Sequence, residues 1–268
     1  MKTSVSLWSY QKYLFAGKMT VVEAIEKIKE AGADAVELLD CFGMNFPQVR
    51  NKLKQLGLKV SSFSVSNNFF CEKEQLDDEI ALVKFGIDAA NYFGAKSVRV
   101  FIGYDNPNHT MEELMAQAIG AFKSLAPYAE ANGIAMSLEN HGLAAGKSYQ
   151  VQAILDAVNS PCMLSNADTG NFFLVDENPV DAIGNLKGRI GLVHLKDVVE
   201  VAEHMQFDSI AGKHFKGTVI GKGQVDLPAI AKILKDSNYD GYLSVEYEGL
   251  EEDILGSVDE SVKYSKAL

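Results

Sequence analysis

Eight short apolar segments alternate along this chain with longer segments of helical period, and this alternation restricts the fold more than any other feature. The apolar segments are residues 3–8, 35–39, 58–64, 97–102, 134–139, 162–168, 190–196 and 242–247. Between them, residues 19–31, 75–93, 110–132 and 227–237 carry apolar side chains at spacings of three and four. Strands that alternate with helices form parallel sheets. The sequence therefore predicts eight βα units.

Glycines mark the junctions where several predicted helices give way to the next strand: Gly32, Gly57, Gly94 and Gly133. Glycine readily takes the left-handed conformation that ends a helix. Eight strands punctuated in this way favour a closed barrel. An open, doubly wound sheet is the alternative, but the glycine-rich dinucleotide motif that often follows its first strand is absent.

We therefore expect an α/β fold, a single (β/α)8 TIM barrel, that spans residues 1–268 as one domain. Such barrels commonly have about 250 residues. The longest irregular stretch lies between the seventh strand and the following helix, at about 198–223. Loops of this length are uncommon in compact domains and often functional, so it is a candidate lid, with a plain surface excursion as the alternative.

The charge balance limits the partners of the chain. Its net charge is −11 at pH 7, and this field repels a phosphate backbone. The three cysteines, at positions 41, 71 and 162, show no pairing pattern, which fits a reducing compartment. No run of about 18 apolar residues occurs. We expect a cytoplasmic protein that binds neither nucleic acid nor membrane; the sequence leaves a homo-oligomer open.

Polar residues stand where the last strands should reach the barrel mouth. In 242–247 the apolar residues Leu243, Val245 and Tyr247 should face the helices, which turns Glu246 inward, with Glu248 beyond it on the same face. The same alternation turns other polar side chains inward near the ends of the preceding strands: Glu139, Asp168, His194 and Lys196. Barrels of this type place their active sites at this face.

Glu139, Asp168, His194 and Glu246 are residue types that bind metals. Carboxylates with one imidazole suit Mn²⁺, Mg²⁺, Co²⁺ or Zn²⁺. Burying three carboxylates together without a cation would cost several kcal/mol. The alternative to one divalent ion is an internal salt-bridge network in which Lys196 and an inward Arg99 neutralise the carboxylates.

Five short motifs then match a known family: 137–142 (SLENHG), 168–171 (DTGN), 194–197 (HLKD), 221–226 (GKGQVD) and 243–246 (LSVE). Over nearly its whole length, the chain resembles the xylose isomerase-like barrels of the sugar phosphate isomerase/epimerase type. The resemblance implies that Glu139, Asp168, His194 and Glu246 bind the metal ion. It also implies that Glu139 and Glu246 are catalytic: one removes a proton next to a carbonyl, and the other returns a proton to the opposite face of the enediolate.

The chain departs from this family at two positions. Many relatives carry a histidine where this chain has Asn171, and the tagatose and psicose epimerases carry a second glutamate where it has Ala145. The glycines of 221–226 leave open whether this turn binds a phosphate or only precedes a helix capped by Asp226. We expect five residues to bind the substrate, although His141 and Trp8 have purely structural alternatives: His141, Lys196, Asn171, Trp8 and Glu37.

The leading hypothesis is a metal-dependent isomerase or epimerase of a small carbohydrate, a sugar, sugar phosphate or cyclic polyol. A dehydratase or lyase of the inosose or dehydroshikimate type is the alternative, because the same enediolate can expel a leaving group. A nuclease of the endonuclease IV type would need more histidines at the mouth than His141 and His194, and we expect the remaining three, His109, His204 and His214, to be unrelated to the barrel metal. A sugar-binding barrel without activity is the last alternative.

Overall fold

The eight predicted strands are all present in the computed structural model, which describes residues 1–268. They form one closed barrel in the order β1-β11-β7-β6-β5-β4-β3-β2, in which every neighbouring pair is parallel. This confirms the (β/α)8 TIM barrel and excludes the open sheet. The strands are β1 (Lys2–Ser6), β2 (Ala35–Leu39), β3 (Lys59–Ser64), β4 (Ser97–Val100), β5 (Ala135–Glu139), β6 (Met163–Asp168), β7 (Ile190–Leu195) and β11 (Tyr242–Val245).

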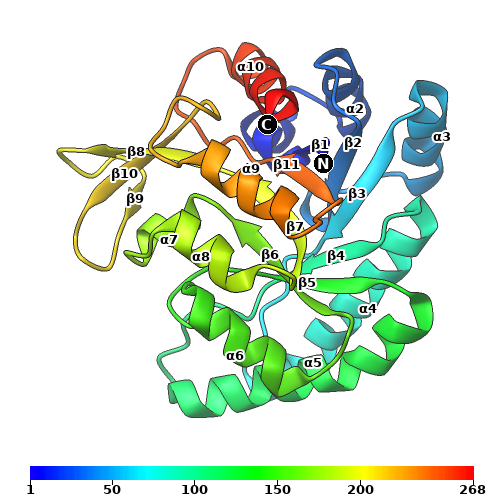
Figure 1. The fold of residues 1–268 in the computed structure, drawn as a ribbon. Coiled ribbons are helices and arrows are strands. Elements are labelled where there is room, and N and C mark those ends of the chain that lie inside the picture. The colour runs from blue at the N-terminus through cyan, green and yellow to red at the C-terminus, as the bar shows by residue number, and fades with distance from the viewer.

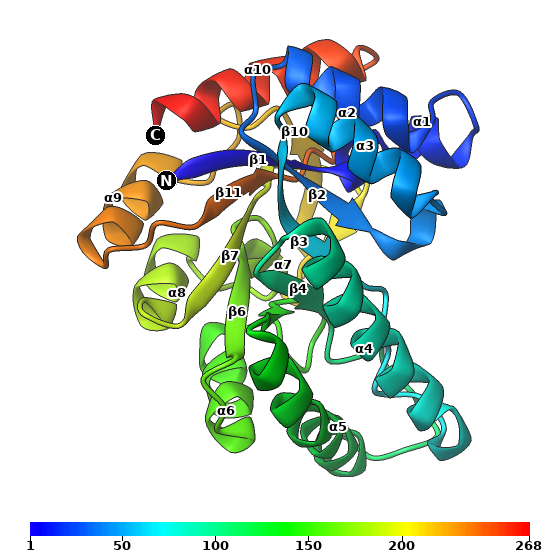
Figure 2. The same cartoon turned by 90° about the vertical axis from the view of Figure 1, so that its right-hand side faces the viewer.

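The helices surround this barrel on the outside, as the two orthogonal views in Figures 1 and 2 show. They are α1 (Gln11–Phe15), α2 (Val21–Glu30), α3 (Phe46–Leu56), α4 (Leu76–Phe93), α5 (Met111–Asn132), α6 (Ser148–Val158), α7 (Asn171–Leu174), α8 (Pro179–Leu186), α9 (Leu227–Asp236) and α10 (Ile254–Ala267). Three of the predicted glycine stops, Gly57, Gly94 and Gly133, cap α3, α4 and α5 in the left-handed conformation. None of these helices combines the length and the apolar character needed to cross a bilayer.

One cluster of 62 buried apolar residues fills the space in the fold that the strands and helices enclose. The inward faces of the strands are instead rich in serine: Ser4 hydrogen-bonds Ser61 at 2.7 Å, and Ser97 hydrogen-bonds Ser137 at 2.8 Å. Both pairs are buried. The barrel interior is therefore polar, which prepares it to hold charged side chains at one end.

The stretch after β7 is more regular than predicted. It forms a three-stranded antiparallel sheet, in the order β8-β10-β9, from β8 (Asp197–Val201), β9 (Phe207–Asp208) and β10 (His214–Thr218). This hairpin sheet projects beyond the barrel at the left of Figure 1. The prediction of an irregular loop at 198–223 is wrong, because this stretch contains three paired strands. These strands were missed because β9 has only two residues and β8 follows β7 after a single residue.

The first strand is also shorter than predicted. It ends at Ser6, whose hydroxyl accepts the N–H of Trp8 at 3.3 Å and caps the short 3-10 helix η1 (Leu7–Tyr10). Trp8 therefore stands in this turn and not at the end of a strand. A second 3-10 helix, η2 (Asp40–Phe42), brings Phe42 to 6.2 Å from the indole, and a third, η3 (Lys73–Gln75), precedes α4.

Candidate metal centre and active site

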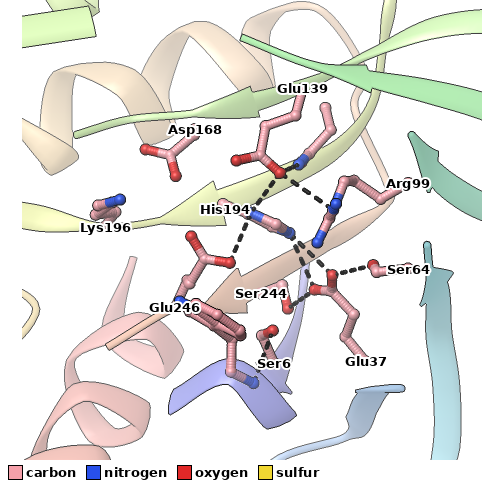
Figure 3. Close-up of polar contacts among 12 residues, drawn as sticks. Ser6, Glu37, Ser64, Arg99, Glu139, Asp168, His194, Lys196, Ser244 and Glu246 are labelled. Atoms are coloured by element: carbon pink, nitrogen blue, oxygen red, sulfur yellow. Dashed lines mark hydrogen bonds and ion pairs between the residues drawn. The ribbon is translucent and has the colours of Figure 1, made fainter. Parts of the chain in front are cut away.

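Four side chains from four neighbouring strands converge at the carboxyl end of the barrel. Glu139 and Asp168 end β5 and β6, His194 lies near the end of β7, and Glu246 directly follows β11. Parallel register aligns these ends: Asp168 pairs with His194, and the N–H of Glu246 donates to the carbonyl of Leu195. One potential ligand atom from each of the four lies within 4.8 Å of the others (Figure 3). The inward polar ends that the alternation predicted thus form one cluster.

His194 lies at the centre of this cluster. Its Nδ1 atom is 3.2 Å from Oε1 of Glu246 and 3.6 Å from Oε2 of Glu139. Glu139 also contacts Arg99, whose Nε lies 3.2 Å from Oε2. None of these four side chains, of His194, Glu246, Glu139 and Arg99, belongs to a residue that exposes more than 5% of its surface. These charges therefore interact in a largely water-free space, where their effect on one another is strong.

Glu37 on β2 holds the other side of the His194 ring. Its carboxylate oxygens lie 3.0 and 3.1 Å from Nε2 of His194, and accept from Ser64 at 2.5 Å and from Ser244 at 2.7 Å. An ionised carboxylate only accepts hydrogen bonds, so it places the ring proton on Nε2 and leaves Nδ1 with a lone pair when the ring is neutral. Carboxylates hold metal-binding histidines in this way. Glu37 is fully buried, and both of its carboxylate oxygens accept hydrogen bonds from the protein. In this structure it therefore orients His194, whereas the sequence predicts that it contacts the substrate.

Two atoms of the cluster indicate that it fits a cation. Oδ2 of Asp168 and Nδ1 of His194 are buried and make no hydrogen bond. An unsatisfied buried acceptor costs about 1–3 kcal/mol. Oδ1 of Asp168, in contrast, accepts the N–H groups of Gly170 and Asn171, which fixes the direction of the carboxylate. The open oxygen and nitrogen therefore form, with the two glutamates, a donor set suited to one hard or borderline divalent ion.

The pKa shifts express the same excess of negative charge. Burial raises the pKa of Asp168 well above its usual range; Lys196 opposes this shift, while Glu246 and Glu139 add to it. Burial lowers the pKa of His194, but Glu246 and Glu37 raise it by more, so that it lies well above the ordinary histidine value. Burial raises the pKa of Glu246, yet His194 outweighs it and lowers the pKa. Without a metal ion, the cluster thus holds extra protons.

The predicted partners of a metal-free salt-bridge network behave differently from one another. Arg99 contacts Glu139 as expected. Lys196 does not contact the four clustered residues; its Nζ pairs with Glu248 and donates to Oδ1 of Asn171 at 3.1 Å. One guanidinium is therefore the only permanent cation in direct contact with this set of carboxylates, which leaves the network incomplete.

Glu248 connects three of the predicted substrate-binding residues. Besides Lys196, which in turn reaches Asn171, it accepts the indole Nε1–H of Trp8 at 2.5 Å. Burial lowers the pKa of Lys196, but Glu248 and Asp168 raise it by more, so the ammonium group stays charged. Strand alternation predicts only that Glu248 lies beyond Glu246 on the same inward face. Its place two residues further along the same strand face was the signal for this role above the metal cluster.

A cavity of about 150 Å³ opens above the cluster, bounded by Trp8, Lys196, His141, Phe101 and Tyr104. Phe101 and Tyr104 follow β4, and their rings lie 5.1 and 5.8 Å from that of His141. Burial lowers the pKa of His141, which keeps its imidazole neutral. Pockets for drug-sized ligands have roughly 300–1,000 Å³, so this one suits a small molecule. The two aromatic residues were missed, although Phe101 lies two residues beyond the inward Arg99 in the predicted strand 97–102, and this spacing was a signal for it; β4 itself ends at Val100.

Comparison with known proteins agrees with this arrangement. The family described as "Xylose isomerase-like TIM barrel" matches residues 25–268. The chain belongs to this family. An inosose dehydratase from Clostridium botulinum (strain Alaska E43 / Type E3) is 23% identical over 249 residues, which are 85% of this chain and 82% of that protein.

Two solved structures share the xylose isomerase-like fold across almost the whole chain. A D-allulose 3-epimerase from Methylomonas sp. has a TM-score of 0.77 at 17% identity and covers 100% of this chain, with 97% of its own length matched. A probable 3-DHS dehydratase from Bacillus anthracis has a TM-score of 0.78 at 18% identity, with 98% of each chain covered. Epimerases and dehydratases thus both occur among the proteins with this architecture.

The glycine turn at 221–226, a possible phosphate site in the sequence, is bound by the side chain of Asp197. Its Oδ2 atom accepts the N–H groups of Gly221 and Gly223, both at 2.9 Å, and Oδ1 accepts that of Val225 at 3.1 Å. A Cβ atom on Gly223 would lie 2.0 Å from Oδ1. These amides are therefore occupied by a carboxylate of the chain itself, and the following Asp226 caps α9.

Proposed function

We propose that this protein is a metal-dependent isomerase or epimerase that moves a proton next to the carbonyl of a small polyhydroxylated substrate. The observation that carries the proposal is the placement of Glu139 and Glu246, which approach Nδ1 of His194 from strands separated by β6 and β7. Two carboxylates on different sides of one small cavity suit removal of a proton from one face and its return to the other.

Glu139, Asp168, His194 and Glu246 would hold the metal ion, whose identity among Mn²⁺, Mg²⁺, Co²⁺ and Zn²⁺ is open. When bound, such an ion supplies Lewis acidity, which polarises a carbonyl and favours the negative charge of an enediolate. Glu246 begins as the base in this scheme, because its carboxylate lines the cavity, where it can accept a proton from the substrate carbon. Glu37 holds the His194 ring in place through Nε2.

The substrate would lie in the cavity above the cluster. The ammonium group of Lys196 and the neutral imidazole of His141 are placed to donate to substrate oxygens. Trp8 offers an aromatic face for the carbon skeleton of the substrate, and the hydrogen bond from Nζ of Lys196 to Oδ1 holds Asn171 near the barrel mouth. Since the cavity is small and the glycine turn at 221–223 is occupied by Asp197, we favour a substrate without phosphate.

A dehydratase is the second candidate, and one comparison favours it. The curated relatives that match about 85% of the chain are inosose dehydratases. Expulsion of a hydroxyl group next to the enediolate needs a proton donor, and the glutamate that has taken the substrate proton can return it to the leaving hydroxyl group, which departs as water. The first steps are shared, so the two candidates differ only in whether the proton returns to carbon or water leaves.

Incubation with a panel of ketoses, keto-sugars and inososes in D₂O separates the candidates. We expect deuterium next to the carbonyl with an otherwise unchanged mass, read by NMR and mass spectrometry. Loss of the mass of water would establish the dehydratase. Absence of exchange with every substrate, in protein shown by elemental analysis to carry metal, would contradict the proton-transfer proposal itself.

Matched variants test the roles of the two glutamates. With two bases, Glu139→Gln and Glu246→Gln should each abolish product, while one of them still exchanges the hydrogen of one epimer. Glu260→Gln, at an exposed ion pair with Lys222, is the control and should behave as the wild type. Elemental analysis of each variant separates lost metal from a lost base. A gel shift with abasic DNA, expected to be negative, tests the nuclease alternative.

A further inference from the structure

The hairpin sheet beyond the barrel brings together two of the histidines that the sequence separates. His204 lies in the bend between β8 and β9, Asp208 ends β9, and His214 begins β10. His214 and Asp208 face each other in the β9–β10 ladder. The sequence predicts that neither histidine serves the barrel metal; in the structure, the two converge on a carboxylate of their own.

The three side chains form a compact donor set. Nδ1 of His204 lies 2.8 and 2.9 Å from the two oxygens of Asp208, and Nδ1 of His214 lies 2.6 Å from Oδ1. The imidazole rings stand nearly perpendicular, at 88°, with their centroids 6.3 Å apart. One donor atom of each residue falls within 4.8 Å of the others. Two imidazoles and a carboxylate are a common ligand set for Zn²⁺ with an open position.

The backbone around this set is fixed by contacts outside it. The N–H of Ser209 donates to the carbonyl of Lys213 at 2.8 Å, which closes the turn between the strands. Asp176 accepts from the hydroxyl of Ser209 and from the N–H of Ala211, which ties the turn to the segment after α7. Asp208 and His214 are therefore held in register before any ligand binds.

We propose that His204, Asp208 and His214 form a second divalent-cation site, for a borderline ion such as Zn²⁺, separate from the barrel cluster. Water would complete the coordination, because the three side chains are partly exposed. The site also touches the mouth of the barrel: Asp208 and Ile210 line a cavity of about 220 Å³ together with His141 and Asn171. An ion bound here would hold the hairpin against that cavity.

Zinc titration of the untagged, folded protein, followed through the ¹⁵N signals of its five imidazoles, tests this site. We expect saturable shifts of the Nδ1 signals of His204 and His214, and two zinc equivalents per chain by elemental analysis after removal of free metal. His204→Gln and Asp208→Asn should each lower this number to one. Asp168→Asn, which removes a barrel ligand, should also leave one, with the shifts of His204 and His214 intact.

His109 supplies the matched control, because it is a partly exposed histidine paired with one carboxylate, Glu72, at 2.8 Å. His109→Gln should keep both zinc equivalents. The proposal is overturned if His204→Gln and Asp208→Asn bind as much zinc as the wild type, or if the imidazoles of His204 and His214 respond no more than that of His109. Circular dichroism of each variant confirms that the fold is retained.

Discussion

Replacing Glu37 by glutamine should weaken metal binding at the barrel mouth while the fold persists. Glu37 makes no contact with the space where the ion would lie, and acts only through Nε2 of His194. Glutamine has nearly the same shape, so the packing at this fully buried position should survive. The change therefore isolates the orientation and basicity of His194.

The magnitude follows from the hydrogen bonds of Glu37. Its two oxygens accept from Ser64, Ser244 and His194, and a glutamine offers only one oxygen for these donors. Hydrogen bonds to a charged group contribute about 1.5–3 kcal/mol and neutral ones about 0.5–1.5 kcal/mol, so the histidine bond weakens by roughly 1–1.5 kcal/mol. Loss of such a supporting carboxylate typically costs about 10–100-fold in metal affinity, and we expect a value towards the lower end.

Calorimetric titration of metal-free protein with Mn²⁺ or Co²⁺ measures this affinity. Ser64→Ala is the matched control, because it removes one hydrogen bond to Glu37 but keeps the carboxylate charge beside Nε2 of His194, and it should raise the dissociation constant less than Glu37→Gln does. An unchanged dissociation constant in Glu37→Gln, with thermal unfolding like that of the wild type, would refute the reasoning that Glu37 supports a metal ligand.

Four further predictions concern metal binding, charge, recognition and stability. Mn²⁺ at 100 times its dissociation constant for the barrel cluster adds about 2.7 kcal/mol and should raise the unfolding temperature of the wild type by roughly 5–10 °C in calorimetry, whereas Asp168→Asn should show a much smaller rise at the same concentration. The pKa of Asp168 is raised in the folded protein, so the protonated carboxyl group stabilises the metal-free protein at low pH, and this stabilisation is lost as the pH rises through that pKa. In metal-free thermal unfolding, Asp168→Asn should therefore gain stability relative to the wild type as the pH rises towards neutral. A difference that stays constant with pH would contradict the shift. Trp8, the single tryptophan, should report substrate binding by its fluorescence, and Trp8→Phe should raise KM more than it lowers kcat, since the ring stays while the bond to Glu248 is lost. Asp197→Ala leaves several backbone N–H groups without their acceptor and should lower the free energy of unfolding by about 3 kcal/mol in denaturant titration.

Most of the cluster could be predicted because its information is local. Alternation within a strand fixes which side chains point inward, and parallel strands bring their carboxyl ends to one edge. Glu139, Asp168, His194 and Glu246 follow from these two rules together with the resemblance.

The residues that support the cluster could not be predicted, because their contacts join distant parts of the chain. Glu37 reaches His194 across 157 positions, and Trp8 reaches Glu248 across 240. No pattern within one strand distinguishes an inward carboxylate that orients a ligand from one that meets the substrate. The three-stranded sheet between 197 and 218 was not predicted for a related reason. The turn between β9 and β10 is stabilised by hydrogen bonds from Ser209 and Ala211 to Asp176, which lies in another segment of the chain.

The protonation of His194 decides between the two interpretations of the barrel cluster. As an imidazolium it would neutralise Glu246 and Glu139, and the cluster would be a salt bridge; as a neutral ring it would present the lone pair of Nδ1 to a metal ion. Glu37 stabilises the Nε2 proton in both states, so it does not discriminate between them. Asp168 does: its Oδ2 atom is buried without a partner in the salt-bridge state, because Lys196 is held by Glu248. A purely structural network would leave that oxygen unpaired at a cost, whereas a bound cation would use it together with Nδ1, and this difference favours the metal centre.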